Sequence, residues 1–306
     1  MIRVATYGNY QTALLNLMSA QQRGHAAELQ LSSGKVGHNH SDFGRTSETI
    51  TALKSTRSRI EGFKQTSQAT VDRLTTQDLA LERIASSATE TRNAITNALA
   101  NGRAEGLMTE ISALFQAVQD GLNTKHQGKY VFAGGAVETV PSSVQSLEGL
   151  AAVADIADIF RNDRLKQTAW VDENINVDVG YLADDLGTEL YEIFQDIAQF
   201  NQGEELTGIL TDTQKTFLTA QISRLDQAAR SLVTVQAANG AVLSRTENIL
   251  ETHVVRADSL EIMLSGKTDA DMAKVVTEIE LSQIAIQASA QVISQLRQVS
   301  LLDYLR

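Results

Sequence analysis

Apolar residues recur at seven-residue intervals in two long stretches of the chain, one in each half. In the first stretch, from about Glu48 to Ala100, the repeating positions are Leu53, Ile60, Ser67, Leu74, Leu81, Ala88 and Ile95. In the second, from Leu218 to Leu264, the apolar positions alternate at spacings of four and three. This spacing keeps one stripe along one side of a slightly underwound helix. The pattern therefore predicts two long helices, each with one seam.

The second stripe is interrupted by polar residues, namely Gln236, Asn239, Thr246 and His253. Polar side chains at seam positions can fix the register of a helix pair at a cost in stability. We therefore expect these residues to lie within the seam and to set its register.

Shorter helical patterns accompany the two long ones. A helix follows the Asn101-Gly102 break, another covers Asp184 to Phe200, and a poorly periodic one covers about Asn9 to Ser32. Ser265-Gly266-Lys267 is expected to end the second long helix, because glycine is common just past a helix end. A last helix is then expected to begin near Asp269.

Between the two halves the pattern changes to one typical of strands. Gly128 to Gly135 is rich in glycine, and Lys166 to Val171 and Ile175 to Val179 alternate in polarity. Two long helices separated by such an insertion most simply fold back antiparallel. The sequence thus predicts a mainly α protein, an elongated antiparallel bundle of long helices with a small inserted domain that contains β-structure.

This layout divides the chain into three predicted domains. Residues 1–45 plus 266–306 are the terminal helices, and residues 46–135 plus 183–265 form a helical rod domain. Residues 136–182 form the small outer domain.

Composition fits this fold and narrows the function. One proline, no cysteine and 5 % aromatic residues favour long helices with aliphatic seams and exclude disulfides and thiolate metal sites. The net charge of −11 argues against nucleic acid and anionic membrane surfaces as partners. No stretch approaches the length of a membrane-spanning helix, and the N-terminus lacks the pattern of a standard secretory signal.

The terminal helices carry apolar residues on more than one side. Large uncovered apolar surface marks an association site, whereas the plainer alternative is that the ends dock on the body of one monomer. We predict an assembly interface that comprises Tyr10, Leu14, Leu17, Leu29, Leu31, Met272, Ile279, Ile286, Ile293, Leu296, Leu301, Leu302, Tyr304 and Leu305.

No motif predicts catalysis, a cofactor or a metal. Gly266-Lys267-Thr268 ends like a phosphate-binding loop, but Glu261 stands where that loop requires glycine. His38, His40 and Asp42 have metal-ligating side chains, yet no further ligand set accompanies them, and a solvated polar turn is the better interpretation. We expect a structural protein rather than an enzyme.

Three stretches match motifs of a known family. Glu28–Lys35 (ELQLSSGK), followed by Ser41-Asp42, is similar to the N-terminal signature L-S-T/S-G-K…S-D-D-P. Gly128–Gly135 (GKYVFAGG) is similar to G-R/K-Y-L-F-A-G-T, and Ser300–Leu305 (SLLDYL) to the C-terminal S-L-L/F-D-Y-L. On these motifs the chain resembles bacterial flagellar axial proteins of the flagellin group.

Two departures from the family pattern refine the resemblance. Phe43 and Gly44 stand where the signature has Asp and Pro, so the turn there is expected to differ in geometry. The I-N-T-N element that opens filament flagellins is absent. Together with the GKYVFAGG segment, this favours the hook–filament junction branch, also called hook-associated protein 3, over the filament-forming branch.

The resemblance implies a structural subunit of the flagellum that joins hook to filament through coiled-coil pairing of its terminal helices. Its partners would be further copies of itself, the neighbouring hook-associated protein, flagellin, an export chaperone and the export apparatus. It would lie outside the cell in the flagellum, exported without a cleaved signal and with its termini disordered before assembly. A filament-forming flagellin and a cytoplasmic helical scaffold remain the alternatives.

Overall fold

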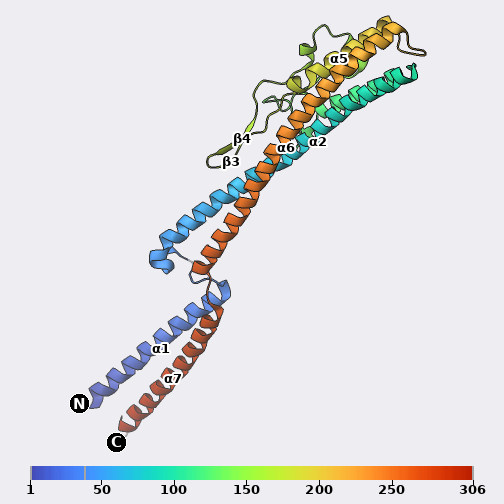
Figure 1. Ribbon diagram of the computed structural model, residues 1–306. Coiled ribbons are helices and arrows are strands. Elements are labelled where there is room, and N and C mark those ends of the chain that lie inside the picture. The colour runs from blue at the N-terminus through green and yellow to red at the C-terminus, as the bar shows by residue number, and fades with distance from the viewer. Residues whose placement is uncertain (1, 38, 305–306) are drawn as a thin grey trace. The chain divides into compact units, whose positions relative to one another are not determined.

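The computed structural model describes residues 2–37 and 39–304, and side chains for residues 8–37, 39 and 41–296. Its helices are α1 (Ile2–Ser33), α2 (Ser47–Asn101), α3 (Leu107–Leu122), α4 (Leu147–Ala151), α5 (Ala183–Gly203), α6 (Asp212–Thr268) and α7 (Met272–Tyr304), with 3₁₀ turns at His40–Thr46 and Ile156–Ile159. The strands are β1 (Lys125–His126), β2 (Lys129–Tyr130), β3 (Thr168–Asp172) and β4 (Ile175–Asp178). The predicted mainly α fold with a small β-containing insertion is confirmed (Figure 1).

The chain forms two compact units, Met1–Arg59 with Arg256–Arg306 and Ile60–Val255, and the boundaries fall inside α2 and α6. In the second unit α2 and α6 run antiparallel. Arg92 Nη1 lies 2.9 Å from Asp226 Oδ1, and Asn239 Nδ2 donates to the carbonyl oxygen of Leu74 at 3.0 Å. From Leu74 to Arg92 along α2, the contacting residue on α6 moves back from Asn239 to Asp226. The two helices are therefore antiparallel, as the sequence predicts.

The seven-residue stripe of α2 is buried from Ile60 onward, whereas its first member, Leu53, is half-buried. Ile60, Ser67, Leu74, Leu81, Ala88 and Ile95 are all buried. The three polar positions Asn239, Thr246 and His253 on α6 are fully buried as well. The expectation that polar residues lie within the α6 seam is therefore confirmed for these three.

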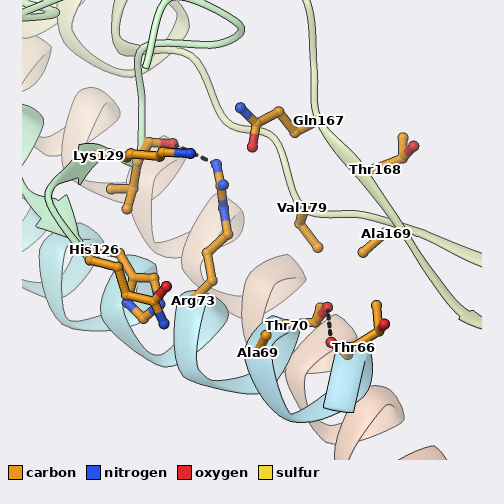
Figure 2. A pocket seen from close by; sticks show the side chains of 12 residues that line it. Thr66, Ala69, Thr70, Arg73, His126, Lys129, Gln167, Thr168, Ala169 and Val179 are labelled. Atoms are coloured by element: carbon orange, nitrogen blue, oxygen red, sulfur yellow. Dashed lines mark hydrogen bonds between the residues drawn. The ribbon is translucent and has the colours of Figure 1, made fainter. Parts of the chain in front are cut away.

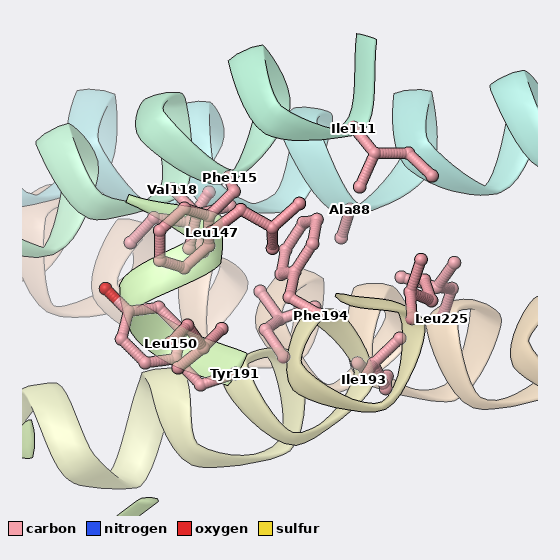
Figure 3. Close-up of a cluster of buried hydrophobic side chains, with 14 of the residues drawn as sticks. Ala88, Ile111, Phe115, Val118, Leu147, Leu150, Tyr191, Ile193, Phe194 and Leu225 are labelled. Atoms are coloured by element: carbon pink, nitrogen blue, oxygen red, sulfur yellow. The ribbon is translucent and has the colours of Figure 1, made fainter. Parts of the chain in front are cut away.

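The main core lies among α2, α3, α5 and α6 (Figure 3). Phe115 of α3 is fully buried, with its ring 5.3 Å from that of Tyr191 and 5.5 Å from that of Phe194, both on α5. Close approach of α3 to α2 depends on Gly121, because a Cβ there would stand 2.6 Å from Ile84 Cγ1. This aromatic cluster holds α3 against α5, and Gly121 allows α3 to lie close to α2.

The inserted strands β3 and β4 pair antiparallel and pack on α2 and α6. The carbonyl oxygen of Val171 on β3 accepts a hydrogen bond from Ser67 Oγ of α2 at 3.3 Å. His253 Nε2 of α6 lies 2.7 Å from the same oxygen. Gln77 Nε2 of α2 donates to the carbonyl oxygen of Val179 at 2.8 Å. Buried side chains of both long helices thus hold the inserted strands.

The predicted helix end at Ser265-Gly266-Lys267 is wrong, because α6 continues to Thr268. The last turn closes without a left-handed glycine: the Asp269 amide donates to the carbonyl oxygen of Ser265 at 2.8 Å. Helix α7 begins at Met272, slightly later than expected, and Asp271 Oδ1 caps it by accepting from the Ala273 amide at 3.0 Å.

The turn that precedes α2 differs from the family pattern, as the sequence predicts. Gly44 has a φ of +48°, whereas proline is restricted to φ near −65°. Asp42 Oδ2 accepts the Asn39 amide at 2.9 Å, and a Cβ at Gly37 would stand 2.3 Å from Asp42 Cβ. The segment is therefore a tight turn in which glycine is needed at two positions.

Candidate assembly surface on the terminal helices

Helices α1 and α7 pack antiparallel through a seam of small side chains (Figure 1). Ala13, Ala20 and Ala27, seven residues apart on α1, are 8 %, 0 % and 3 % exposed. On the same helix, a Cβ at Gly24 would meet Ser282 Cβ of α7 at 3.3 Å, and Ser282 is itself buried. Arg23 Nε lies 3.6 Å from Glu278 Oε1 at the side of this seam. Small residues therefore allow a close helix pair that covers little apolar area.

The large apolar side chains of both helices lie outside this seam. Leu15 on α1 is 64 % exposed and Ile284 on α7 is 62 % exposed. Further exposed residues are Leu14, Met18, Leu29, Leu31, Met272, Val276, Leu281 and Val292. Two neighbouring helices of one unit thus present a broad apolar surface, which is the signature of an association site.

The predicted interface residues divide into three groups. Leu14, Leu29, Leu31 and Met272 are exposed, and Tyr10, Leu17, Ile279, Ile286, Ile293 and Leu296 are half-buried. The side chains of Leu301, Leu302 and Tyr304, and all of Leu305, lie outside the described residues. Whether these residues form an assembly interface stays a prediction.

The predicted set omits several of the most exposed apolar residues, namely Leu15, Met18, Val276, Leu281, Ile284 and Val292. On α7 the prediction followed the seven-residue row from Met272 to Ile293, most of which is half-buried. Apolar residues that lie away from that row were the sequence signal that could have identified the more exposed positions.

Backbone hydrogen bonds join the segment that follows α1 to the segment that precedes α7. The Val36 amide donates to the carbonyl oxygen of Thr268 at 2.8 Å, and the Ala270 amide to that of Gly34 at 2.9 Å. Beside this bridge Lys35 Nζ forms an ion pair with Asp269 Oδ1. Ser265 Oγ donates to Asp269 Oδ2 at 2.6 Å and Thr268 Oγ1 to Asp269 Oδ1 at 3.0 Å. The Gly34-Lys35 end of the ELQLSSGK motif therefore anchors the pair.

The Asp269 carboxylate should make this joint sensitive to acid. The hydrogen bond from Lys35, followed by those from Ser265 and Thr268, lowers the pKa of Asp269 from 3.8 to about 2. Because the folded pKa is depressed, the stabilisation is complete above about pH 4 and is lost as the pH falls towards 2. We expect the difference in Tm between the assembled wild type and assembled Asp269→Asn to shrink over this range.

The control for this prediction is Asp258→Asn, which removes an exposed carboxylate from α6 in the same unit. The same pH series on this variant gives the baseline for removing a carboxylate that is not part of the joint. A constant difference for Asp269→Asn would contradict the assigned pKa.

Ser282 offers a second test of the seam. Its side chain is 2 % exposed, and its Oγ has no hydrogen-bond partner among the described residues. A buried hydroxyl without a partner costs about 1–3 kcal/mol, so Ser282→Ala should raise the free energy of unfolding of the α1–α7 pair by about 1 kcal/mol. Hydrogen exchange of α7 amides in the assembled protein measures this.

The matched control is Ser294→Ala, at an exposed position of the same helix. It adds only the helix propensity of alanine, roughly 0.5 kcal/mol. Equal or smaller stabilisation by Ser282→Ala would mean that its hydroxyl is satisfied in solution.

The His38-His40-Asp42 cluster and the Gly266-Lys267-Thr268 motif, named from the sequence, fall partly outside the described residues or within a helix. His38 and the side chain of His40 lie outside the described residues, and the Asp42 carboxylate is engaged by Asn39. Gly266-Lys267-Thr268 forms the last turn of α6 rather than a loop. Among the described residues no cluster of three metal-ligating side chains occurs, and none of their helices has the length and apolarity to span a bilayer.

Comparison with known proteins identifies one matching protein family and several solved structures with a similar fold. Residues 222–305 match the family described as the bacterial flagellin C-terminal helical region. No curated protein matches the chain.

Several solved structures share the fold. A Vibrio parahaemolyticus protein described as a flagellar hook-associated protein is 12 % identical with a TM-score of 0.61, covering 74 % of this chain and 100 % of its own. Bacillus cereus FlgL is 14 % identical with a TM-score of 0.58, covering 70 % and 99 %. Flagellar hook-associated protein 3 of Legionella pneumophila is 14 % identical with a TM-score of 0.57, covering 71 % and 98 %.

The resemblance inferred from the three motifs is confirmed. Residues 222–305 match the C-terminal helical region of bacterial flagellins, and the chain shares its fold with the solved flagellar hook-associated proteins.

Proposed function

We propose that this chain is a structural subunit of the bacterial flagellum that joins hook to filament. The observation that carries the proposal is the broad apolar surface on the paired terminal helices, which extends well beyond their own seam. The fold, shared with FlgL and with hook-associated protein 3, supports the same role. In this role the exposed leucines and isoleucines of α1 and α7 are covered by neighbouring subunits.

The predicted domains acquire roles in this proposal. Residues 1–45 plus 266–306 form the axial core, disordered before assembly, and residues 46–135 plus 183–265 form the rod outside it. Residues 136–182 form the outer domain. Segments that order only on binding stay apart until a partner covers their apolar residues, which would keep subunits from polymerising before export.

The proposed partners are copies of this chain, the neighbouring hook-associated protein and flagellin, with an export chaperone and the export apparatus acting before assembly. The proposed location is the flagellum outside the cell, reached without a cleaved signal. The proposed role is structural, and it requires no catalysis or cofactor.

Immunogold labelling of intact flagella tests the proposal. Label confined to the boundary between hook and filament is the expected result, because a junction subunit occupies one zone of the axial structure. Label along the filament shaft would instead assign a filament-forming flagellin. Label only in the cytosol would overturn both readings in favour of a helical scaffold.

A further inference from the structure

A cavity of about 300 Å³ lies in the unit formed by Ile60–Val255. Helix α2 forms its floor with Thr70 and Arg73, and the β1–β2 hairpin forms one wall with His126 and Lys129. The chain around Gln167 and Val179 forms the opposite wall. Figure 2 shows Arg73 rising from α2 between these two walls. Three segments far apart in the sequence therefore meet around one guanidinium.

The lining of this cavity is positive, although the chain as a whole carries a net charge of −11. Arg73 and Lys129 both contribute to it, and no Asp or Glu occurs among its lining residues. A cavity that collects cations in an acidic protein, with no carboxylate beside them, has a local field that favours anions.

Arg73 is the unusual group in this cavity. Its Nη2 donates a long hydrogen bond of 3.3 Å to the carbonyl oxygen of Val131, and its Nε is buried without a hydrogen-bond partner among the described residues. Burial lowers the pKa of the guanidinium. An arginine nevertheless stays charged in proteins, and a buried charge is costly unless it is paired. Within the described part of the chain no carboxylate forms an ion pair with Arg73.

Other polar side chains that line the cavity already donate hydrogen bonds within the protein. The hydroxyl groups of Thr66 and Thr70 already donate to the carbonyl oxygens of Gly62 and Thr66, at 3.1 and 2.8 Å. Gln167 Nε2 donates to the carbonyl oxygen of Gly134 at 2.7 Å. This leaves the guanidinium of Arg73 and the exposed ammonium group of Lys129 as the two cationic donors.

We propose that this cavity binds a small oxyanion, a phosphate or a carboxylate, between Arg73 and Lys129. The planar fork of a guanidinium matches two oxygens of such an ion, and the ion supplies the charge and the acceptors that the protein does not place beside Arg73. Lys129 adds a second positive charge from the hairpin. This site is independent of the assembly surface and goes beyond the proposed structural function.

Isothermal titration calorimetry with inorganic phosphate and with acetate, at constant ionic strength set by NaCl, tests the proposal on the full chain. We expect saturable binding of at least one of the two ions. Loss of a charge-assisted hydrogen bond should weaken the affinity about tenfold or more in Arg73→Gln. Lys129→Gln should weaken it less, because that ammonium group is exposed and screened by solvent.

The matched control is Arg83→Gln, which removes the same charge from an exposed position of α2. It should leave the affinity within about twofold, because its charge acts through solvent. Circular dichroism reveals whether Arg73→Gln unfolds the protein. If it does, the test is whether Lys129→Gln weakens the affinity more than Arg83→Gln does. Absence of saturable binding of both ions, or equal loss in the cavity variant and the Arg83 control, would overturn the proposal.

Discussion

The double variant Leu281→Ser with Ile284→Ser should fold like the wild type and fail to enter the flagellum. Both side chains lie on α7, 56 % and 62 % exposed, outside the seam with α1. Full burial of an exposed leucine or isoleucine contributes about 1.5–3 kcal/mol. Because these two side chains expose a little over half of their surface, the double variant loses roughly 2–4 kcal/mol per subunit on assembly. Circular dichroism measures folding, and immunoblots of sheared flagella measure incorporation.

Ile209→Ser provides the control for this prediction. Ile209 is 76 % exposed and lies in the other compact unit, outside the terminal helices. It should be incorporated at the wild-type level. Normal incorporation of the α7 double variant would show that its exposed face is not an assembly contact and would remove the main support for the proposed function.

Phe115→Ala should destabilise the unit Ile60–Val255 by about 3–5 kcal/mol. The ring is fully buried against Tyr191 and Phe194, so its removal leaves a cavity between α3 and α5, within a core that α2 and α6 complete. The loss combines the transfer of the ring with the cost of an unfilled cavity. Urea denaturation followed by far-ultraviolet circular dichroism measures it as a lower midpoint.

Leu79→Ala is the matched control in the same unit. Leu79 is 62 % exposed on α2, and its truncation should change the free energy of unfolding by no more than about 0.5 kcal/mol. A similar small effect of Phe115→Ala would mean that α3 and α5 move together and close the cavity.

The long helices could be predicted from sequence because a seven-residue period is a geometric property of one helix and needs no knowledge of its partner. The α2 stripe shows this, since its members from Ile60 to Ile95 are buried. Strands β3 and β4 could be predicted equally well, because alternation in polarity is local. The two-residue strand β1 is too short to show such a pattern. The end of α6 was misplaced at Gly266 because a glycine that ends one helix can continue another, and the difference lies in the hydrogen bond from Asp269 to Ser265.

The surfaces were harder to predict because they depend on which side of a helix its neighbour covers. In α1 and α7 the alanines and Gly24 form the seam, and this choice exposes Leu15 and Ile284. The apolar pattern alone would favour a seam that buries the large side chains, such as Leu15 and Ile284, and exposes the alanines. The cavity at Arg73 gave no sequence signal, because Arg73, Lys129 and Gln167 come from separate segments.

The carbonyl oxygen of Val171 contacts both long helices and so helps to fix their alignment. A seam with a seven-residue repeat looks nearly the same after one helix slides by one repeat, about 10 Å at 1.5 Å per residue. Such a slide of α6 would carry His253 away from Val171, while Ser67 of α2 would keep its own bond to that oxygen.

A slipped helix pair would then bury an imidazole with neither nitrogen bonded, because Nδ1 of His253 already lacks a partner among the described residues. The inserted strands therefore distinguish the native alignment from its nearest competitor, a task that repeating leucines cannot perform. Without the insertion, contacts between the two helices such as those of Asn239 with Leu74 and of Arg92 with Asp226 would remain to fix the alignment. A chain that lacked the insertion should therefore populate other alignments of α2 against α6 more than the full chain does, even if it remained fully helical.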